Sequence, residues 1–199
     1  MPGSSLTLVL ATRNPGKVAE MRALLADLPV VLRSAAEIEG APEVEEDAPT
    51  LEGNALKKAR ALHAHTGLPA LADDTGLEVD ALGGAPGVHS ARYAGPAAAD
   101  ATNRARLLRE LGGTADRTAR FRTVIAFVED GRVRTFEGTC EGHILHEERG
   151  TGGFGYDALF VPEDHDRTFA ELPPDAKNAI SHRGRALRAF IHYLRERIG

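Results

Sequence analysis

The chain has 199 residues, of which 42% are hydrophobic and 27% charged, a balance typical of a folded globular protein and not of a disordered one. Its formal net charge of −5 argues against a broad basic face for coating nucleic acid, although a local cluster of donors could still bind a small anion. Residues 1–5 carry no basic side chain, no apolar run is long enough to span a bilayer, and a lone Cys140 cannot form an intramolecular disulfide. We therefore expect a cytoplasmic protein without a signal peptide, a membrane segment or a nucleic-acid partner.

The first third of the chain alternates strand and helix patterns. Residues 6–11 are apolar and predict a buried strand that ends in a polar turn. The apolar spacing of residues 17–28 predicts a helix, which Pro29 ends. The further elements expected here are a strand over 30–32, an exposed acidic loop over 37–49, a helix over 50–65 with Thr50 and Gly67 as its caps, and a strand over 68–72.

The remainder of the chain contains a strong hairpin pattern. Residues 119–128 and 133–145 alternate apolar and polar side chains around Asp130-Gly131, which favours a tight turn between two antiparallel strands. Residues 82–96 are too irregular in pattern to assign, residues 154–161 are expected to be extended, and helices are expected over 100–111 and 181–198. Without repeats or linkers, residues 1–199 are interpreted as a single α/β domain with a mixed sheet.

The segment Thr-Arg-Asn-Pro-Gly-Lys over residues 12–17 joins the first predicted strand to the first predicted helix. Ligands of α/β folds bind at the carboxyl ends of strands, where a helix N-terminus offers unpaired N–H groups. The amide of Asn14 and the cation of Lys17 suit a phosphate chain. A plain helix cap with a solvated Lys17 explains the segment equally well, and the segment is not a P-loop.

Asp73 and Asp74 follow the predicted strand over 68–72. Two adjacent carboxylates can hold Mg²⁺, and one of them could accept a proton from a water molecule. Asp-Asp-Thr-Gly is also good turn chemistry, so a turn is the alternative. A further metal ligand could come from the acidic loop, whose other acids would be solvated: Glu43, Glu45, Glu46 and Asp47.

The glycine-rich segment over 150–155 fits the dinucleotide pattern G-x-G-x-x-G. No helix pattern follows it, so the dinucleotide-binding oxidoreductase is the weaker hypothesis. Phe154 between two glycines could stack on a base, and a buried core position is the alternative. Three hydrogen-bond donors lie close to the start of the last predicted helix: Lys177, His182 and Arg183. The helix dipole disfavours basic residues at a helix N-terminus, so their presence there favours a functional role.

Five stretches, taken in order, resemble the inosine/xanthosine triphosphate pyrophosphatase family: residues 8–17, 71–77, 83–93, 150–157 and 180–184. The resemblance implies hydrolysis of the non-standard purine nucleotides ITP, dITP and XTP to the monophosphate and pyrophosphate, which cleanses the nucleotide pool. It also implies an elongated α/β domain with a long mixed β-sheet flanked by helices, two lobes with the active site in the cleft between them, a Mg²⁺ requirement and a homodimer.

The resemblance also implies a role for each matching residue. Asp74 would be the general base, supported by Asp73, and both would hold the metal with Glu46, for which Glu45 is the alternative. The triphosphate would contact Thr12, Asn14, Lys17 and Lys58. Phe154 would stack on the base, and the edge of the base would contact Asp157, Lys177, His182 and Arg183. The further substrate-binding residues would be Arg13, Pro15, Gly16, Thr75, Gly155 and Tyr156.

The implied chemistry is attack of water on the α-phosphorus, with pyrophosphate as the leaving group. A 6-oxo purine accepts hydrogen bonds from Lys177 or Arg183, whereas a 6-amino purine cannot, so donors there would select the base. A nucleotide-binding sensor without turnover is the competing hypothesis. Such a sensor would keep Phe154 and the donors but would not need the Asp73-Asp74 pair.

Overall fold

The computed structural model describes residues 5–198, so the expectation for the first residues falls largely outside the described part of the chain. Seven strands form one mixed sheet with the order β2-β1-β3-β5-β6-β7, and β4 pairs with β3. The prediction of an α/β fold with a mixed sheet is therefore confirmed. The contacts divide the chain into two compact units. Unit 1 comprises the chain up to Asp74, Val124–Glu137 and the chain from Ala186 on, and unit 2 comprises Thr75–Thr123 and Gly138–Arg185.

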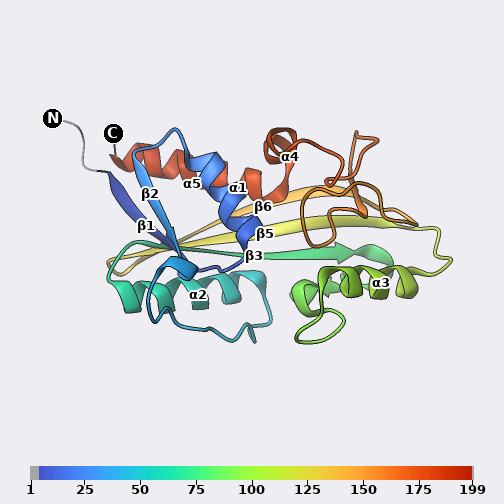
Figure 1. Cartoon of the computed structure of the whole chain (residues 1–199), viewed down its shortest axis with the longest axis horizontal. Coiled ribbons are helices and arrows are strands. Elements are labelled where there is room, and N and C mark those ends of the chain that lie inside the picture. Colours follow the sequence, from blue (N-terminus) through green and yellow to red (C-terminus); the bar gives the residue numbers. More distant parts are fainter. Residues whose placement is uncertain (1–4, 199) are drawn as a thin grey trace. The chain divides into compact units, whose positions relative to one another are not determined.

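Unit 1 is a sheet covered on both faces by helices (Figure 1). In β1, Leu8 and Leu10 face one way and pack with α1 and α5, while Val9 between them faces α2. This is the alternation expected of a strand that is buried on both sides. The elements wholly in unit 1 are β1 (Leu6–Leu10), α1 (Pro15–Leu25), β2 (Val30–Ser34), η1 (Ala35–Glu37) and α2 (Leu51–Thr66).

Local signals in the sequence set several boundaries as predicted. The hydroxyl of Thr50 accepts a hydrogen bond from the N–H of Gly53 at the start of α2, and Gly67 ends α2 in the left-handed conformation. Asp130 and Gly131 both have positive φ, as a two-residue hairpin turn requires. The hairpin joins β5 (Thr118–Glu129) to β6 (Arg132–Ile144), and its strands extend into both units.

Unit 2 has its own core, in which the aromatic rings of Phe121, Phe160 and Phe169 pack together. Its further elements are η2 (Asp80–Leu82), β4 (Pro86–Gly87), η3 (Ser90–Arg92), α3 (Asp100–Leu111), β7 (Phe160–Pro162) and α4 (Pro174–Ile180). Besides β5 and β6, two elements belong partly to each unit, namely β3 (Ala70–Val79) and α5 (His182–Ile198). The sequence pattern did not predict α4.

The expectation of an extended segment over 154–161 was wrong for residues 154–159 and is confirmed only for the last two, which belong to β7. The chain makes turns until Phe160, where β7 begins. The carboxylate of Asp157 accepts a hydrogen bond from the N–H of Phe154, and Gly153 and Gly155 both have positive φ. Glycine tolerates this conformation, which lets the segment fold back on itself. Because these turns contain no helix, they also give no support to a dinucleotide fingerprint.

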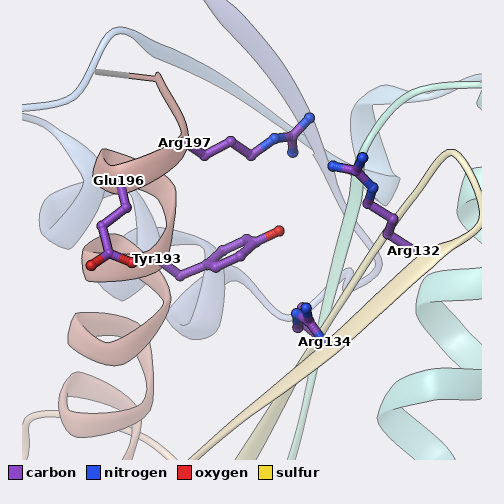
Figure 2. Close-up of a pocket in the computed structure, with 5 residues that line it drawn as sticks. All are labelled: Arg132, Arg134, Tyr193, Glu196 and Arg197. Atoms are coloured by element: carbon purple, nitrogen blue, oxygen red, sulfur yellow. The ribbon is translucent and has the colours of Figure 1, made fainter.

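Two further features complete the fold. In unit 1, the end of α5 and the start of β6 enclose a pocket lined by Arg132, Arg134, Tyr193, Glu196 and Arg197 (Figure 2). Within residues 5–198, no helix combines the length and the apolar character that a membrane span needs. The expected cleft between two lobes stays a prediction.

We predict that Gly142→Ala destabilises the protein by about 2 kcal/mol, since overpacking costs of this size are typical. An added Cβ at Gly142 would collide with the carbonyl oxygen of Val161 in the neighbouring β7 and lie 2.6 Å from the ring of Phe160. Gly113→Ala is the control, because nothing lies within 4 Å of its added Cβ. Denaturant unfolding of both variants measures the difference, and equal stabilities would contradict the close approach.

Candidate active site

The N-terminus of α1 is built by the segment that was predicted to bind phosphate. The side chain of Asn14 caps the helix by accepting from the N–H of Lys17 at 3.1 Å, and the hydroxyl of Thr12 accepts from the N–H of Asn14 at 3.2 Å. Pro15 occupies the first turn, where its missing N–H costs nothing. The helix-cap alternative therefore holds for Asn14, but the alternative of a solvated Lys17 is wrong, because its ammonium lies 3.0 Å from a carboxylate oxygen of Asp73.

The carboxylates of Asp73 and Asp74 lie inside β3 and not in a turn, so the turn alternative is wrong. The described pairing with β1 covers Ala70 and Leu71, which places both acids just past the carboxyl end of β1. Successive side chains of a strand point to opposite faces. Asp73 accordingly meets Lys17 of α1, while Asp74 meets Lys58 of α2 at 3.3 Å.

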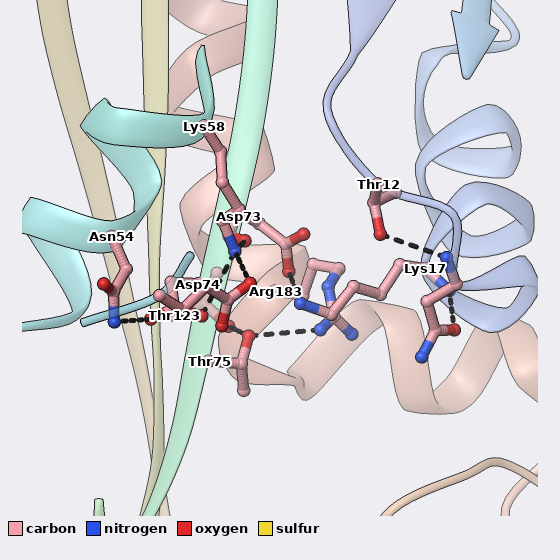
Figure 3. A network of polar contacts seen from close by, with 11 residues as sticks. Thr12, Lys17, Asn54, Lys58, Asp73, Asp74, Thr75, Thr123 and Arg183 are labelled. Carbon is pink, nitrogen blue, oxygen red and sulfur yellow. Dashed lines mark hydrogen bonds and ion pairs between the residues drawn. The ribbon is translucent and has the colours of Figure 1, made fainter. Parts of the chain in front are cut away.

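Lys58 connects the acids of unit 1 (Figure 3). Its ammonium donates to the carboxylate of Glu46 at 2.9 Å, to the backbone carbonyl of Asp73 at 2.8 Å and to the carboxylate of Asp74 at 3.3 Å. Burial alone would lower the pKa of Lys58, because it disfavours the charged form. The attraction of Asp74, Glu46 and Asp73 outweighs burial and raises the pKa, so this ammonium stays charged.

Burial has the opposite consequence for Asp74, whose side chain is 7% exposed. It raises the pKa of Asp74, against the lowering effects of Lys58 and Lys17, and the nearby Glu46 raises it further. A raised pKa makes this carboxylate a better proton acceptor than a solvated aspartate. Asn54 is buried beside it, and its amide N–H donates to Asp74 at 3.2 Å.

The acidic loop contributes Glu46 to this set of contacts and not Glu45. The carboxylate of Glu46 reaches Lys58, whereas Glu45 is exposed and contributes its backbone carbonyl to Lys57 at 3.1 Å. Asn54 also fixes the loop, because its side-chain oxygen accepts from the N–H of Ala48 at 2.9 Å. Arg13, from the segment over residues 12–17, also contacts this loop. Its guanidinium donates to the carbonyl of Ala41 at 2.8 Å and lies 3.9 Å from the carboxylate of Glu43.

The donor set fits a hard divalent cation. Glu46 and Asp74 both lie within hydrogen-bond distance of the same ammonium, so their oxygens already face one positive charge. Mg²⁺ is typically held by one or two carboxylates together with water and substrate phosphates. Among the described residues, no three His, Cys, Asp or Glu side chains form a ready metal cluster, so substrate oxygens would have to complete the coordination.

Unit 2 gathers the residues that were predicted to contact a base. Lys177 of α4 forms a buried ion pair with Asp157 at 2.6 Å. The ammonium of Lys177 lies 4.9 Å, and the guanidinium carbon of Arg183 5.5 Å, from the ring centroid of Phe154. Phe154 is only half-buried, so its ring is not a core side chain. A partly exposed ring with two cations beside it suits an electron-rich heterocycle.

His182 and Arg183 start α5 and are both buried. The imidazole of His182 stacks on Phe121 with the ring centroids 4.5 Å apart. Arg183 donates to the hydroxyl of Thr75 at 3.1 Å, and that hydroxyl lies 2.6 Å from the hydroxyl of Thr123 (Figure 3). Packing therefore holds His182 in place, while polar contacts hold Arg183.

The two remaining predicted residues shape the turns of unit 2. The N–H of Gly155 donates to Asp100 at 2.7 Å, and its carbonyl accepts from Arg104 at 2.8 Å. Tyr156 is buried, and its hydroxyl donates to the carbonyl of Ser90 at 2.8 Å. Burial raises the pKa of Tyr156, so this hydroxyl stays protonated. Both residues thus position the segment that carries Phe154.

Two buried polar residues of these networks were missed by sequence reasoning, Asn54 and Thr123. Asn54 lies four residues before Lys58 on α2, so it shares a helix face with that lysine. This spacing was the feature of the sequence that could have indicated it. Thr123 lies in β5 and gave no signal, because threonine is an ordinary strand residue.

The chain is similar to known proteins along nearly its whole length. The sequence model of the Ham1 family matches residues 8–193. A dITP/XTP pyrophosphatase of Geobacter sulfurreducens is 56% identical over 94% of this chain and 96% of its own. One of Streptomyces coelicolor is 49% identical over 96% of this chain and 98% of its own.

Solved structures are similar as well. A HAM1 protein from Coxiella burnetii superposes with a TM-score of 0.88 at 46% identity, covering 96% of this chain and 99% of its own. The Staphylococcus aureus Ham1 protein has a TM-score of 0.86 at 36% identity, with the same coverage of 96% and 99%.

We predict that Lys58→Ala lowers the free energy of unfolding at neutral pH by roughly 3 kcal/mol, because it leaves buried carboxylates without their cation. The neighbouring Lys57→Ala is the matched control, since Lys57 pairs with the exposed Asp47 and should contribute little. Denaturant unfolding compares the two variants. Equal losses of stability in the two variants would show that the buried Lys58 stabilises the protein no more than the exposed Lys57 does.

Proposed function

Because the chain belongs to the Ham1 family, we propose that it hydrolyses the non-standard purine nucleoside triphosphates dITP, XTP and ITP to the monophosphate and pyrophosphate. The relatives named dITP/XTP pyrophosphatase support this substrate class. The observation that carries the proposal is the pair of acids, Asp74 and Glu46, held by the one ammonium of Lys58.

We further propose that Mg²⁺ is the cofactor, with Asp74 and Glu46 as its protein ligands and Asp73 in support. When bound, a divalent cation neutralises the charge that develops on the phosphate oxygens. The carboxylates themselves argue for it, since buried acids repel a triphosphate and only an intervening cation makes the two compatible.

The residues of unit 1 divide the remaining work. Asp74 orients the attacking water and accepts its proton, and its two oxygens are held by Lys58 and Asn54. Lys17 and Lys58 balance the negative charge of the phosphates, and the N-terminus of α1 adds N–H donors. Attack on the α-phosphorus then expels pyrophosphate. A sensor without turnover gains nothing from such acids, so the enzyme is the better-supported hypothesis.

The residues of unit 2 are assigned to the base. Phe154 offers its half-exposed ring for stacking, and Lys177 and Arg183 offer donors to a 6-oxo group. Asp157 pairs with Lys177 and fixes its ammonium. The family resemblance adds a homodimer and a place in the cytoplasm to this proposal.

We predict Mg²⁺-dependent release of pyrophosphate and IMP from ITP, and a loss of at least roughly a hundred-fold in kcat for Asp74→Asn with substrate still bound, because an amide is a poor proton acceptor. Ion-exchange chromatography identifies the products, and a pyrophosphate assay measures kcat for the two proteins. Inosine diphosphate and orthophosphate as products would contradict the proposed bond cleavage.

The neighbouring acids provide the control for this experiment. Glu46→Gln should raise the Mg²⁺ concentration needed for half-maximal rate, whereas Glu45→Gln should not, because the side chain of Glu45 is exposed and away from Lys58. Similar effects of the two variants would remove Glu46 from the proposed metal site.

We predict that Arg183→Ala narrows the gap in kcat/KM between ITP and ATP by roughly ten- to a hundred-fold, because a lost donor penalises only the 6-oxo base. Phe154→Ala should weaken both substrates alike, since stacking tolerates any base. Thr75→Ala is the control for the contact between Arg183 and Thr75 and should leave the ratio unchanged. An equal loss for ITP and ATP in Arg183→Ala would leave that arginine with a structural role.

A further inference from the structure

A second concentration of positive charge in unit 1 includes none of the residues assigned to the reaction. The pocket between β6 and the end of α5 has a volume of about 310 Å³ and is lined by three arginines, a tyrosine and a glutamate (Figure 2). Arg132 and Arg134 are two positions apart on β6 and therefore lie on one face of that strand. Arg197 approaches the same space from α5.

The positive charge of this pocket is only partly neutralised. Arg197 forms an ion pair with the buried Glu129. Within residues 5–197, by contrast, neither Arg132 nor Arg134 has a hydrogen-bond or ion-pair partner. Glu196 turns its carboxylate away from the arginines in Figure 2 and lies 3.3 Å from the imidazole of His192 on its own helix. Two guanidinium groups of this pocket are thus available to an anion.

Tyr193 supplies a fixed wall with a polar end. Its ring packs against Phe127 and Phe136, with centroid separations of 6.1 and 5.6 Å. Figure 2 shows its hydroxyl directed toward the space between Arg132 and Arg134. Among the described residues this hydroxyl has no hydrogen-bond partner, so it is a ready donor for a ligand oxygen.

We propose that this arginine pocket, formed by Arg132, Arg134, Tyr193 and Arg197, binds a compact phosphorylated anion with two linked phosphate groups. Arginine presents paired N–H groups that match phosphate oxygens, and several guanidiniums around one space favour more than one phosphate. The volume is at the lower end of the range of about 300–1,000 Å³ for small-molecule sites, which fits a diphosphate better than a large cofactor. The diphosphate could be free pyrophosphate or part of a nucleoside diphosphate.

The test must separate this pocket from the phosphate-binding residues of the proposed active site. Calorimetric titration with inorganic pyrophosphate therefore starts from a Lys17→Ala variant, which keeps the buried Lys58 in place and is checked for its fold by circular dichroism. We expect it to retain one binding event that weakens at least about ten-fold when Arg132→Gln and Arg134→Gln are added. Arg197 is left in place, because its loss would strand the buried Glu129.

Controls distinguish a built site from general charge. Arg60→Gln with Arg195→Gln removes two exposed arginines outside the pocket and should leave pyrophosphate affinity within about two-fold. Tyr193→Phe should weaken binding without changing charge. The proposal is overturned if the lysine variant binds no pyrophosphate, or if the two pairs of arginine substitutions weaken binding equally.

A second titration with inosine diphosphate identifies the source of the diphosphate. If inosine diphosphate binds more tightly than pyrophosphate, and the substitutions of Arg132 and Arg134 abolish this binding, the pocket is assigned to a nucleotide. If inosine diphosphate binds equally well or more weakly, the pocket is assigned to the free anion. Hydrolysis of ITP by the Arg132→Gln, Arg134→Gln variant is measured separately, so that failure of this site and failure of the proposed reaction give different results.

Discussion

The buried ammonium of Lys58 holds the acidic half of the site together. Without it, only Lys17 and Asn54 would balance the buried carboxylate of Asp74 and the partly buried carboxylate of Glu46. Such an arrangement costs several kcal/mol for each uncompensated charge. The same cation holds one oxygen of Asp74 and one of Glu46 on a single ammonium, which fixes both carboxylates beside the site that we propose for Mg²⁺. The requirement for charge balance in the free protein and the proposed chemistry therefore select the same geometry.

Local chemistry explains why much of the fold was predictable. Thr50 and Gly67 cap α2 through their own side chain and backbone, and Asp130-Gly131 forms the hairpin turn from residues adjacent in the chain. The predictions were wrong where contacts between residues distant in the sequence determine the local structure. The chain continues as strand through Asp73 and Asp74 because Lys17 and Lys58, from two different helices, neutralise them. A pattern restricted to residues 68–77 contains neither lysine.

The site shows the same division. The resemblance indicated Lys58, Asp74, Phe154 and Arg183 as members of the site, and the structure places each among charged or aromatic partners of its own unit. Their roles as ligands of a substrate remain predictions. The choice between Glu45 and Glu46 was open in the sequence, because neighbours in an irregular loop have no periodicity to separate them. In the structure Lys58 contacts the carboxylate of Glu46 and not that of Glu45, and the choice of metal ligand stays a prediction.

The placement of Asp73 and Asp74 on opposite faces of β3 restricts how this protein can evolve. One residue inserted or deleted between Ala70 and Asp73 would move each acid to the opposite face of β3 and would leave one of the two lysines, Lys17 or Lys58, opposite an uncharged residue. We therefore expect relatives to vary in the length of their surface loops while this short stretch keeps a constant number of residues. Substitutions can change its sequence, but insertions and deletions should be absent from it.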